Sequence, residues 1–232
     1  MKDRVTKLEV ADFKNKWCNE NPIIASIVKN KIANHFKPPI LDVGAGLGDI
    51  DYNALADKEV ICIDVNKITE EDYPLADKHK RIQIDFFDYI PEKPINTVFI
   101  SHTLQFIDED VVKLNEKLNE IAPDNLIIVL NKNNDFMGEL IEWSEQHYEN
   151  PNPEVKLDNF PIGYSQVEQV DFKAKLTCDS FDHLANQISY LMLIDLDATK
   201  QPLLISFLNE RLSNPEFEFN QVIEIYTKNG GK

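Results

Sequence analysis

The chain has 232 residues, of which 43% are hydrophobic and 28% are charged, as expected for a globular protein large enough to bury its own core. Its 40 acidic and 24 basic side chains give a formal charge of −16, which disfavours a protein whose main task is to grip nucleic acid. The three cysteines, Cys18, Cys62 and Cys178, are far apart and odd in number. They predict neither a disulfide framework nor a zinc site, and we expect no metal.

The N-terminal residues lack the apolar segment of a secretory signal, and no apolar run approaches the length needed to span a membrane. We therefore expect a cytoplasmic protein that does not act at a membrane. A reducing compartment also agrees with the sparse, unpaired cysteines.

The first predicted helix covers residues 21–36, where apolar side chains recur at helical spacing until Pro38 and Pro39 force its end. A helix-length segment follows the first strand, and an amphipathic helix is expected at 109–122. Short apolar runs rich in β-branched residues predict strands at 40–43, 60–65, 81–87, 95–101 and 125–131.

The pattern changes after residue 131. A helix is expected at 135–148, a proline-rich loop at 149–164, a half-exposed strand at 167–178, helices at roughly 180–195 and 200–213, and a last strand at 216–227. The alternation of strands and helices predicts an α/β fold with a doubly wound, mostly parallel seven-stranded sheet. Helices should cover both of its faces, and the C-terminal strand should be antiparallel. No segment demands a linker, so we expect a single domain.

The segment "PPILDVGAGLGDID", residues 38–51, places three of the chain's seven glycines within five positions, directly after a predicted strand. Glycines there let the backbone turn sharply and approach a ligand at the carboxyl edge of the sheet. A dinucleotide site, a site for S-adenosylmethionine and a plain tight turn are the alternatives. The NAD fingerprint GxGxxG needs a third glycine where Asp49 stands, which counts against NAD.

The stretch "LDVGAGLGD" resembles motif I of the class I S-adenosylmethionine-dependent methyltransferases, an acidic residue followed by GxGxG. The resemblance extends over roughly residues 20–227, because later landmarks follow in order. It implies S-adenosylmethionine as the cofactor, S-adenosylhomocysteine as the product, and one methyltransferase-like domain over residues 1–232. Residues 1–37 would form an N-terminal helical cap, and residues 149–215 would supply the loop and helices of the acceptor site.

The resemblance also implies roles for individual residues at the ends of the predicted strands. Asp42 would lie near the methionine portion of the cofactor, and Asp64 would accept two ribose hydroxyls. Val65 would lie against the adenine. In "QIDFFDYIP", Asp85 would receive the adenine amino group, with Asp88 as the alternative, and Phe86 would pack on the ring. The complete predicted cofactor set is Asp42, Gly44, Ala45, Gly46, Gly48, Asp64, Val65, Asp85, Phe86 and Ser101.

His102 follows the predicted strand 95–101, near the expected position of the reactive methyl group. It is the candidate general base, since an imidazole can take a proton from a hydroxyl or ammonium acceptor. The alternative is a histidine that only lines the pocket or bonds to the loop. In some related O-methyltransferases a catalytic histidine would align with Gln105, which cannot act as a base, so that mechanism does not carry over. The motif [DN]-P-P-[YF] of amino-directed nucleic-acid enzymes is also absent, because the strand ends in "SHTL".

Residues outside the motifs should form the acceptor site. The candidates for substrate binding are Phe13, Trp17, Phe160, Tyr164 and His183. Together these features predict a methyltransferase that moves a methyl group to an O or N atom of a small molecule by in-line displacement, with no nucleic-acid or membrane partner. The alternatives are methylation of a protein or RNA partner, and a non-catalytic cofactor-binding member of the fold.

Overall fold

The structure is a computed structural model, and it describes residues 16–67, 76–104, 111–148, 160–192, 194 and 196–230. Three predicted features lie outside these residues: Phe13, Gln105, and most of the loop 149–164.

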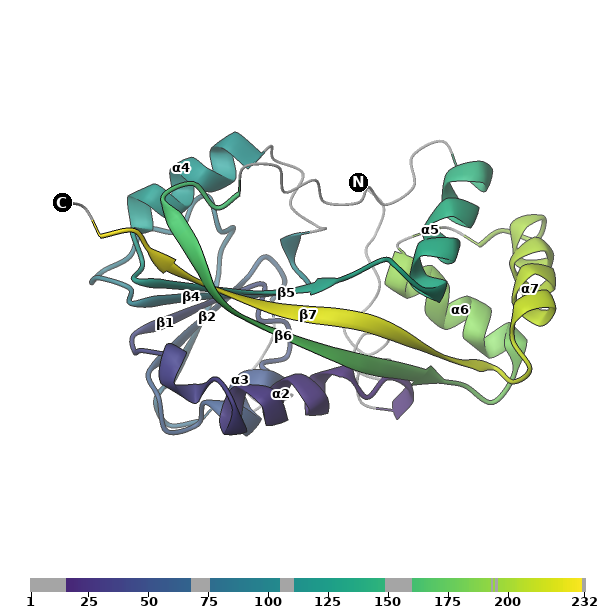
Figure 1. Cartoon of the computed structure of the whole chain (residues 1–232), viewed down its shortest axis with the longest axis horizontal. Helices are drawn as coiled ribbons and strands as arrows, with labels where there is room; N and C mark the ends of the chain where they lie inside the picture. The colour runs from purple at the N-terminus through teal and green to yellow at the C-terminus, as the bar shows by residue number, and fades with distance from the viewer. Residues whose placement is uncertain are drawn as a thin grey trace. The chain divides into compact units, whose positions relative to one another are not determined.

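Seven strands form one sheet in the order β3-β2-β1-β4-β5-β7-β6. The pairs β1–β2, β1–β4, β2–β3 and β4–β5 are parallel, and the arrow of β7 in Figure 1 points opposite to that of β6. The strands are β1 (Ile40–Val43), β2 (Val60–Asp64), β3 (His79–Gln83), β4 (Thr97–Ser101), β5 (Asn125–Asn131), β6 (Tyr164–Thr177) and β7 (Glu216–Lys228). This topology confirms the predicted mostly parallel seven-stranded sheet with an antiparallel C-terminal strand.

The described helices are α2 (Glu20–Asn30), α3 (Asp49–Ala54), α4 (Val111–Ile121), α5 (Phe136–His147), α6 (Phe181–Met192) and α7 (Lys200–Arg211). A short 3-10 helix, Ala33–His35, follows α2. Within the described ranges, no helix has the length and apolar character needed to cross a membrane.

By their contacts, the residues divide into two compact units, each made of several chain segments. The first comprises residues 24–130, 154–171 and 222–232, and the second comprises residues 1–23, 131–153 and 172–221. Because the chain passes between them several times, neither unit is a continuous stretch of sequence. The single-domain organisation stays a prediction.

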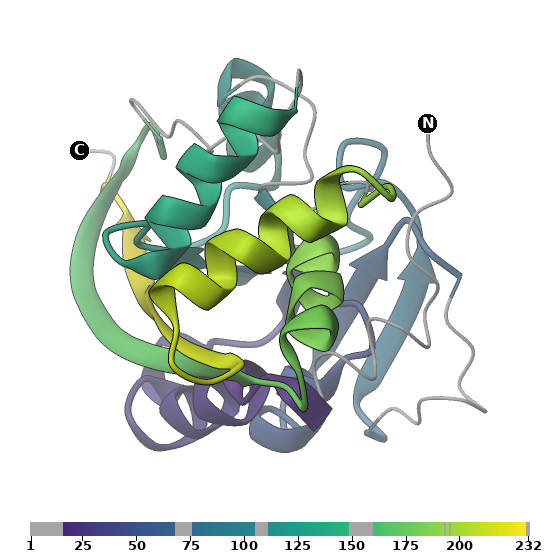
Figure 2. The same cartoon turned by 90° about the vertical axis from the view of Figure 1, so that its right-hand side faces the viewer.

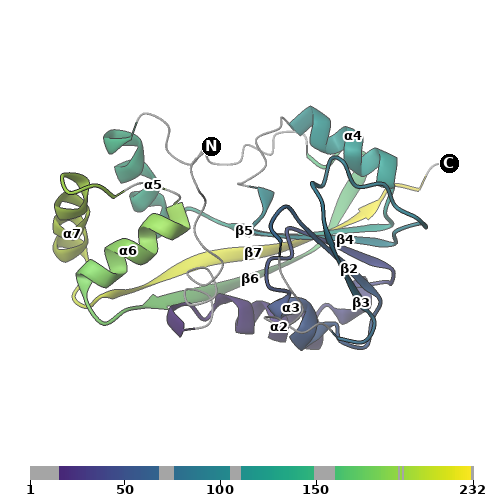
Figure 3. The same ribbon diagram turned by 180° about the vertical axis from the view of Figure 1, so that it is seen from behind.

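The unit that contains β1–β4 also contains the carboxyl ends of the strands at which a ligand site is predicted. Figures 1 and 3 show α4 on one face of these strands and α2 and α3 on the other. Every residue of β1 is buried, since both faces of the sheet are covered, and all of them except Asp42 are apolar. Val43 pairs in register with Ile63 of β2 and Ile100 of β4. The carboxyl ends of these three strands therefore meet at one edge.

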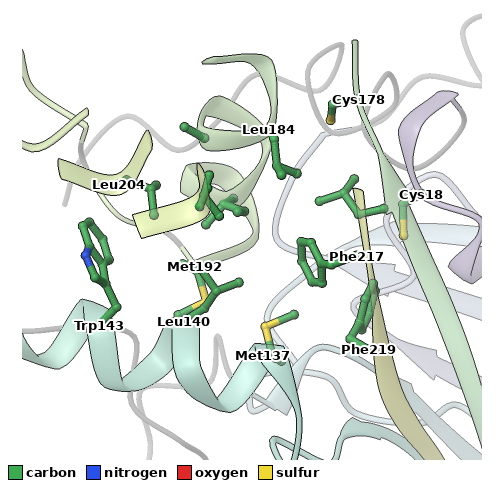
Figure 4. Close-up of a cluster of buried hydrophobic side chains, with 14 of the residues drawn as sticks. Cys18, Met137, Leu140, Trp143, Cys178, Leu184, Met192, Leu204, Phe217 and Phe219 are labelled. Carbon is green, nitrogen blue, oxygen red and sulfur yellow. The ribbon is translucent and has the colours of Figure 1, made fainter. Parts of the chain in front are cut away.

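The other unit has a separate core, formed by α5, α6 and α7 with parts of β6 and β7 (Figure 2). Figure 4 shows its buried side chains, among them Met137, Leu140 and Trp143 of α5 and Phe217 and Phe219 of β7. The helices predicted at 135–148, 180–195 and 200–213 are thus present, and the apolar stripe of α6 is largely core, as its helical spacing suggests.

One predicted strand and one predicted helix end several residues before their predicted C-terminal ends. The strand expected at 81–87 runs from His79 to Gln83, because the Asp85 carboxylate accepts the Phe87 backbone N–H at 2.9 Å and starts a turn. The first helix ends at Asn30 and not at Phe36, and the 3-10 helix occupies part of the remaining stretch.

Candidate functional site

The loop after β1 turns over three glycines with positive φ: 70° at Gly44, 54° at Gly46 and 78° at Gly48. The backbone N–H groups of Gly44 and Ala45 both donate to the Ile63 carbonyl, at 2.8 and 3.1 Å. Gly48 then begins α3 as its N-cap residue. These conformations are ones that other L-residues rarely adopt, which explains the concentration of glycine at this point.

Gly44 and Gly46 face different surroundings. A Cβ atom on Gly44 would lie 2.9 Å from Thr103 Cβ, with the rest of that side chain closer still. A Cβ atom on Gly46 would meet no atom of the described residues within 4 Å. Gly44 is therefore required by packing within the protein, whereas Gly46 leaves open space above the loop into which a ligand could fit.

Asp64, the last residue of β2, lies beside this open space. Its Oδ2 accepts the Gly46 backbone N–H at 3.0 Å, and its Oδ1 accepts the backbone and side-chain N–H groups of Asn66 at 2.8 and 2.9 Å. A carboxylate has about four acceptor positions, and three of them are used here, so one stays open on Oδ2. A second becomes available for vicinal hydroxyls if the exposed Asn66 side chain turns away from Oδ1. Asp64 thus has the position and chemistry predicted for a ribose-binding residue.

The residues predicted to surround adenine have unequal exposure. Val65 follows Asp64 and is 48% exposed, so it offers surface to a ring. Asp85 is exposed in the turn after β3, where it caps Phe87. Phe86, in contrast, is buried in the core and contacts Phe87 edge-on. Its burial argues against the predicted stacking role, and the half-buried Phe87 is the better placed of the two rings.

The end of β4 adjoins the glycine loop. Ser101 is half-buried, and Thr103 Oγ1 donates to the Ser101 carbonyl at 3.1 Å. His102 has a φ of 51°, and its backbone N–H donates to the Val129 carbonyl of β5 at 3.3 Å. His102 is half-buried and its Nε2 is buried, and its role as a general base stays a prediction.

A buried polar network lies beneath the loop. Asp42 and Asp51 are 4% and 0% exposed, and burial raises the pKa of the Asp51 carboxyl. Cys62 Sγ donates to Asp51 Oδ2 at 3.3 Å, and burial raises the pKa of this thiol, which therefore stays protonated. Arg81 of β3 donates from Nη2 to the Leu47 carbonyl inside the loop at 2.8 Å.

Sequence reasoning missed Asp51, Arg81 and Thr103. A carboxylate at the buried helical position of Asp51 and an arginine within a strand are signals that could have identified the first two. The close packing of Thr103 on Gly44 is visible only in the folded chain.

Two of the predicted acceptor residues are brought together. The rings of Trp17 and His183 lie edge to face with their centroids 4.3 Å apart, although 166 residues separate them in the sequence. His183 Nε2 also lies 3.1 Å from Gln187 Nε2, and His183 Nδ1 lies 3.9 Å from Asp179 Oδ2. Both rings are half-buried, so a substrate role for this pair stays a prediction.

Tyr164 is part of the hydrophobic core around β1–β4, and Phe160 lies against that core. The Tyr164 hydroxyl is buried and donates to the Pro123 carbonyl at 3.0 Å, and burial raises the pKa of this phenol to about 12. Pro123 precedes β5, so Tyr164 lies at the amino edge of the parallel strands, opposite the glycine loop. Phe160 packs against the same core. This position argues against the predicted substrate-binding role of Tyr164.

The described residues contain no group of three or more His, Cys, Asp or Glu side chains that could hold a metal ion. The groups able to hold a ligand at the carboxyl edge are thus backbone amides, carboxylates and partly exposed apolar side chains. Such a site suits an uncharged adenosine portion better than a metal complex.

Comparison with known proteins gives a consistent fold. The chain matches a cyclopropane-fatty-acyl-phospholipid synthase-like protein from Lactobacillus casei ATCC 334 with a TM-score of 0.60 and 16% identity, over 90% of each chain. It also matches an S-adenosylmethionine-dependent methyltransferase from Geobacter sulfurreducens, determined in complex with S-adenosylhomocysteine. That match has a TM-score of 0.55 and 12% identity, and it covers 99% of this chain and 100% of the other. No family model and no curated protein matches the sequence.

The chain therefore has the Rossmann-like fold of the class I S-adenosylmethionine-dependent methyltransferases, as the glycine loop and the alternation of strands and helices predicted. At these identities the likeness establishes the fold. The function must be argued from the residues at the carboxyl edge.

Proposed function

We propose that the protein is an S-adenosylmethionine-dependent methyltransferase that acts on an O or N atom of a small molecule. The observation that carries this proposal is the Asp64 carboxylate, hydrogen-bonded to Gly46 at the edge of a loop with open space above it. This arrangement fits an adenosine ribose on Asp64 and the amino-acid portion of the cofactor along the glycine backbone.

In this proposal the protein's residues bind and align, and they exclude water. Bound S-adenosylmethionine would supply a methyl group already activated by its positive sulfur. Asp64 would fix the ribose through two charge-assisted hydrogen bonds, and Val65 would cover one side of the adenine. In-line displacement depends mainly on such alignment, so no covalent nucleophile is needed.

The choice of a small molecule over nucleic acid is supported by charge. The chain carries −16 overall, and the lysines described near β3 have local partners. Lys80 and Lys93 pair with Glu92 and Glu59, and Lys78 donates to the Asp57 carbonyl. Two of the lysines described around β3 are thus already paired with carboxylates, which reduces the charge available to neutralise phosphates.

The proposal is tested by isothermal titration of the purified protein with S-adenosylmethionine, S-adenosylhomocysteine and NAD, combined with mass spectrometry of any co-purified ligand. We expect binding of both sulfur compounds and none of NAD. Release of S-adenosylhomocysteine in a screen of small-molecule acceptors would identify the substrate. Binding without turnover, or turnover only with RNA or protein, would support the two alternatives predicted from the sequence.

The effect of the His102 imidazole can be measured separately from the effect of the unusual backbone conformation at this residue. Asparagine tolerates positive φ, so His102→Asn should preserve the chain conformation while it removes the imidazole. If His102 is the general base, turnover of the identified acceptor should fall about 100-fold or more. The affinity for S-adenosylhomocysteine should stay within about twofold of wild type. Unchanged turnover would instead assign His102 to lining the pocket.

A further inference from the structure

Arg81 lies in the middle of β3, the strand at one edge of the sheet, and its side chain reaches the glycine loop from there. Its Nη2 donates to the Leu47 carbonyl at 2.8 Å, although 34 residues separate the two in the sequence. The side chain is half-buried, and its Nε is inaccessible to solvent. A hydrogen bond from a charged donor is stronger than one between neutral groups, so this contact is a firm attachment for the loop.

The register of the strands explains how Arg81 reaches the loop. Asp42 of β1 pairs with Cys62 of β2, and Cys62 pairs with Arg81 of β3. Residues in register on adjacent parallel strands share a face, so the three side chains form one row across the sheet. Cys62 Sγ donates to Asp51 Oδ2 of α3 at 3.3 Å, which places the row on the face that α3 covers. Arg81 therefore brings a positive charge to the face that holds the buried carboxyls of Asp42 and Asp51, where a cation reduces the cost of burying them.

The carbonyl that Arg81 binds belongs to the half of the loop proposed to face the cofactor. Leu47 stands between Gly46, which borders the open space, and Gly48, which begins α3. The Gly46 N–H donates to the Asp64 carboxylate at 3.0 Å. Asp64 thus attaches this half of the loop to β2, and Arg81 attaches it to β3.

We propose that Arg81 is a positioning residue for the cofactor: by binding the Leu47 carbonyl, it holds residues 46–48 in the shape that receives the amino-acid portion of S-adenosylmethionine. The inference rests on the proposed function, because the loop is taken to bind this cofactor. Arg81 does not contact the cofactor in this scheme. Its loss should therefore weaken the binding of ligands that carry the amino-acid portion, and it should have much less effect on ligands that lack this portion.

Two variants of Arg81 and one control test the proposal. Arg81→Met keeps an unbranched apolar stem but removes the charge and every donor. Arg81→Lys keeps the charge and a single donor group, without the planar guanidinium. Lys80→Met is the matched control, because Lys80 is the preceding residue of β3, has an exposed side chain and pairs in register with Ile61, on the opposite face of the sheet.

Isothermal titration with two ligands separates positioning of the loop from a general loss of structure. S-adenosylhomocysteine carries the amino-acid portion, whereas 5′-methylthioadenosine has the same adenosine and ends in a methyl group. We expect Arg81→Met to bind S-adenosylhomocysteine about tenfold or more weakly than wild type, and 5′-methylthioadenosine within about twofold of wild type. Arg81→Lys should show a smaller loss with the same selectivity, and it gives the comparison if Arg81→Met does not fold. Lys80→Met should bind both ligands within about twofold of wild type.

Amide hydrogen exchange of the protein without ligand provides a second readout. Residues 44–48 should exchange faster in Arg81→Met than in Lys80→Met, while β4 and β5 exchange at equal rates in the two variants. Equal weakening of both ligands, unchanged affinity for S-adenosylhomocysteine, or unchanged exchange of the loop would overturn this inference alone. Failure of the wild type to bind S-adenosylhomocysteine would overturn the proposed function, and this inference with it.

Discussion

Replacing Asp64 with alanine is expected to weaken the binding of S-adenosylhomocysteine about 100-fold. The carboxylate would lose two charge-assisted hydrogen bonds to the ribose, each worth about 1.5 kcal/mol, and 1.4 kcal/mol corresponds to about tenfold in affinity. The substitution would also remove the acceptor of the Gly46 backbone N–H, which donates to Asp64 Oδ2 at 3.0 Å. Isothermal titration calorimetry measures the loss directly.

Asp88→Ala is the control for this prediction. Asp88 is exposed in the turn after β3 and was the alternative to Asp85 in the sequence, so its replacement should leave the affinity within about twofold. Asp64→Asn should fall between wild type and Asp64→Ala, because the amide keeps one acceptor oxygen. Equal affinities for Asp64→Ala and wild type would remove Asp64 from the cofactor site.

Gly44→Ala should mainly lower the stability of the protein, whereas Gly46→Ala should mainly weaken ligand binding. At Gly44, the added methyl group would collide with Thr103 in a backbone with a φ of 70°, which together should cost about 2–4 kcal/mol and lower the melting temperature by roughly 5–15 °C. At Gly46, no atom in the described part of the chain lies within 4 Å of the position that a Cβ would take, so only the backbone strain of about 1 kcal/mol applies. Its methyl group would instead occupy the space proposed for the ligand and weaken binding about tenfold or more.

The two effects are separated by thermal denaturation without ligand and by titration with S-adenosylhomocysteine. Thr103→Ala in the Gly44→Ala background should recover part of the lost stability, because it removes the two side-chain atoms nearest the new methyl group. A Gly46→Ala variant that binds with wild-type affinity would show that the ligand does not approach this part of the loop.

The strands that were predicted best are those covered on both faces of the sheet. Strands β1 and β5 agree with the predicted ranges because strands covered on both faces are largely apolar. The beginning of β3 was missed because this edge strand starts "HKR", and no residue in it is fully buried. Its polar side chains can bond to neighbouring elements: Arg81 donates to the Leu47 carbonyl in the glycine loop.

The site was predictable to the extent that local spacing defines it. Asp64 and the glycines follow from their distance along the chain and from the strand ends. The bond from Arg81 to the Leu47 carbonyl was not predictable, because two residues 34 positions apart indicate nothing until β3 lies beside the glycine loop. The hydrogen bond of Tyr164 was not predictable for a related reason: an aromatic residue after a loop has the same sequence pattern whether its hydroxyl binds a substrate or the Pro123 carbonyl.

The central claim is that the edge formed by Gly44–Gly48 and Asp64 binds S-adenosylmethionine. A crystal structure of the protein grown with saturating S-adenosylhomocysteine tests it most directly. We predict both ribose hydroxyls within hydrogen-bonding distance of the Asp64 carboxylate and the amino-acid portion of the ligand along the glycine loop. A ligand bound elsewhere, a ribose held by a different side chain, or no bound ligand at saturation would contradict the claim.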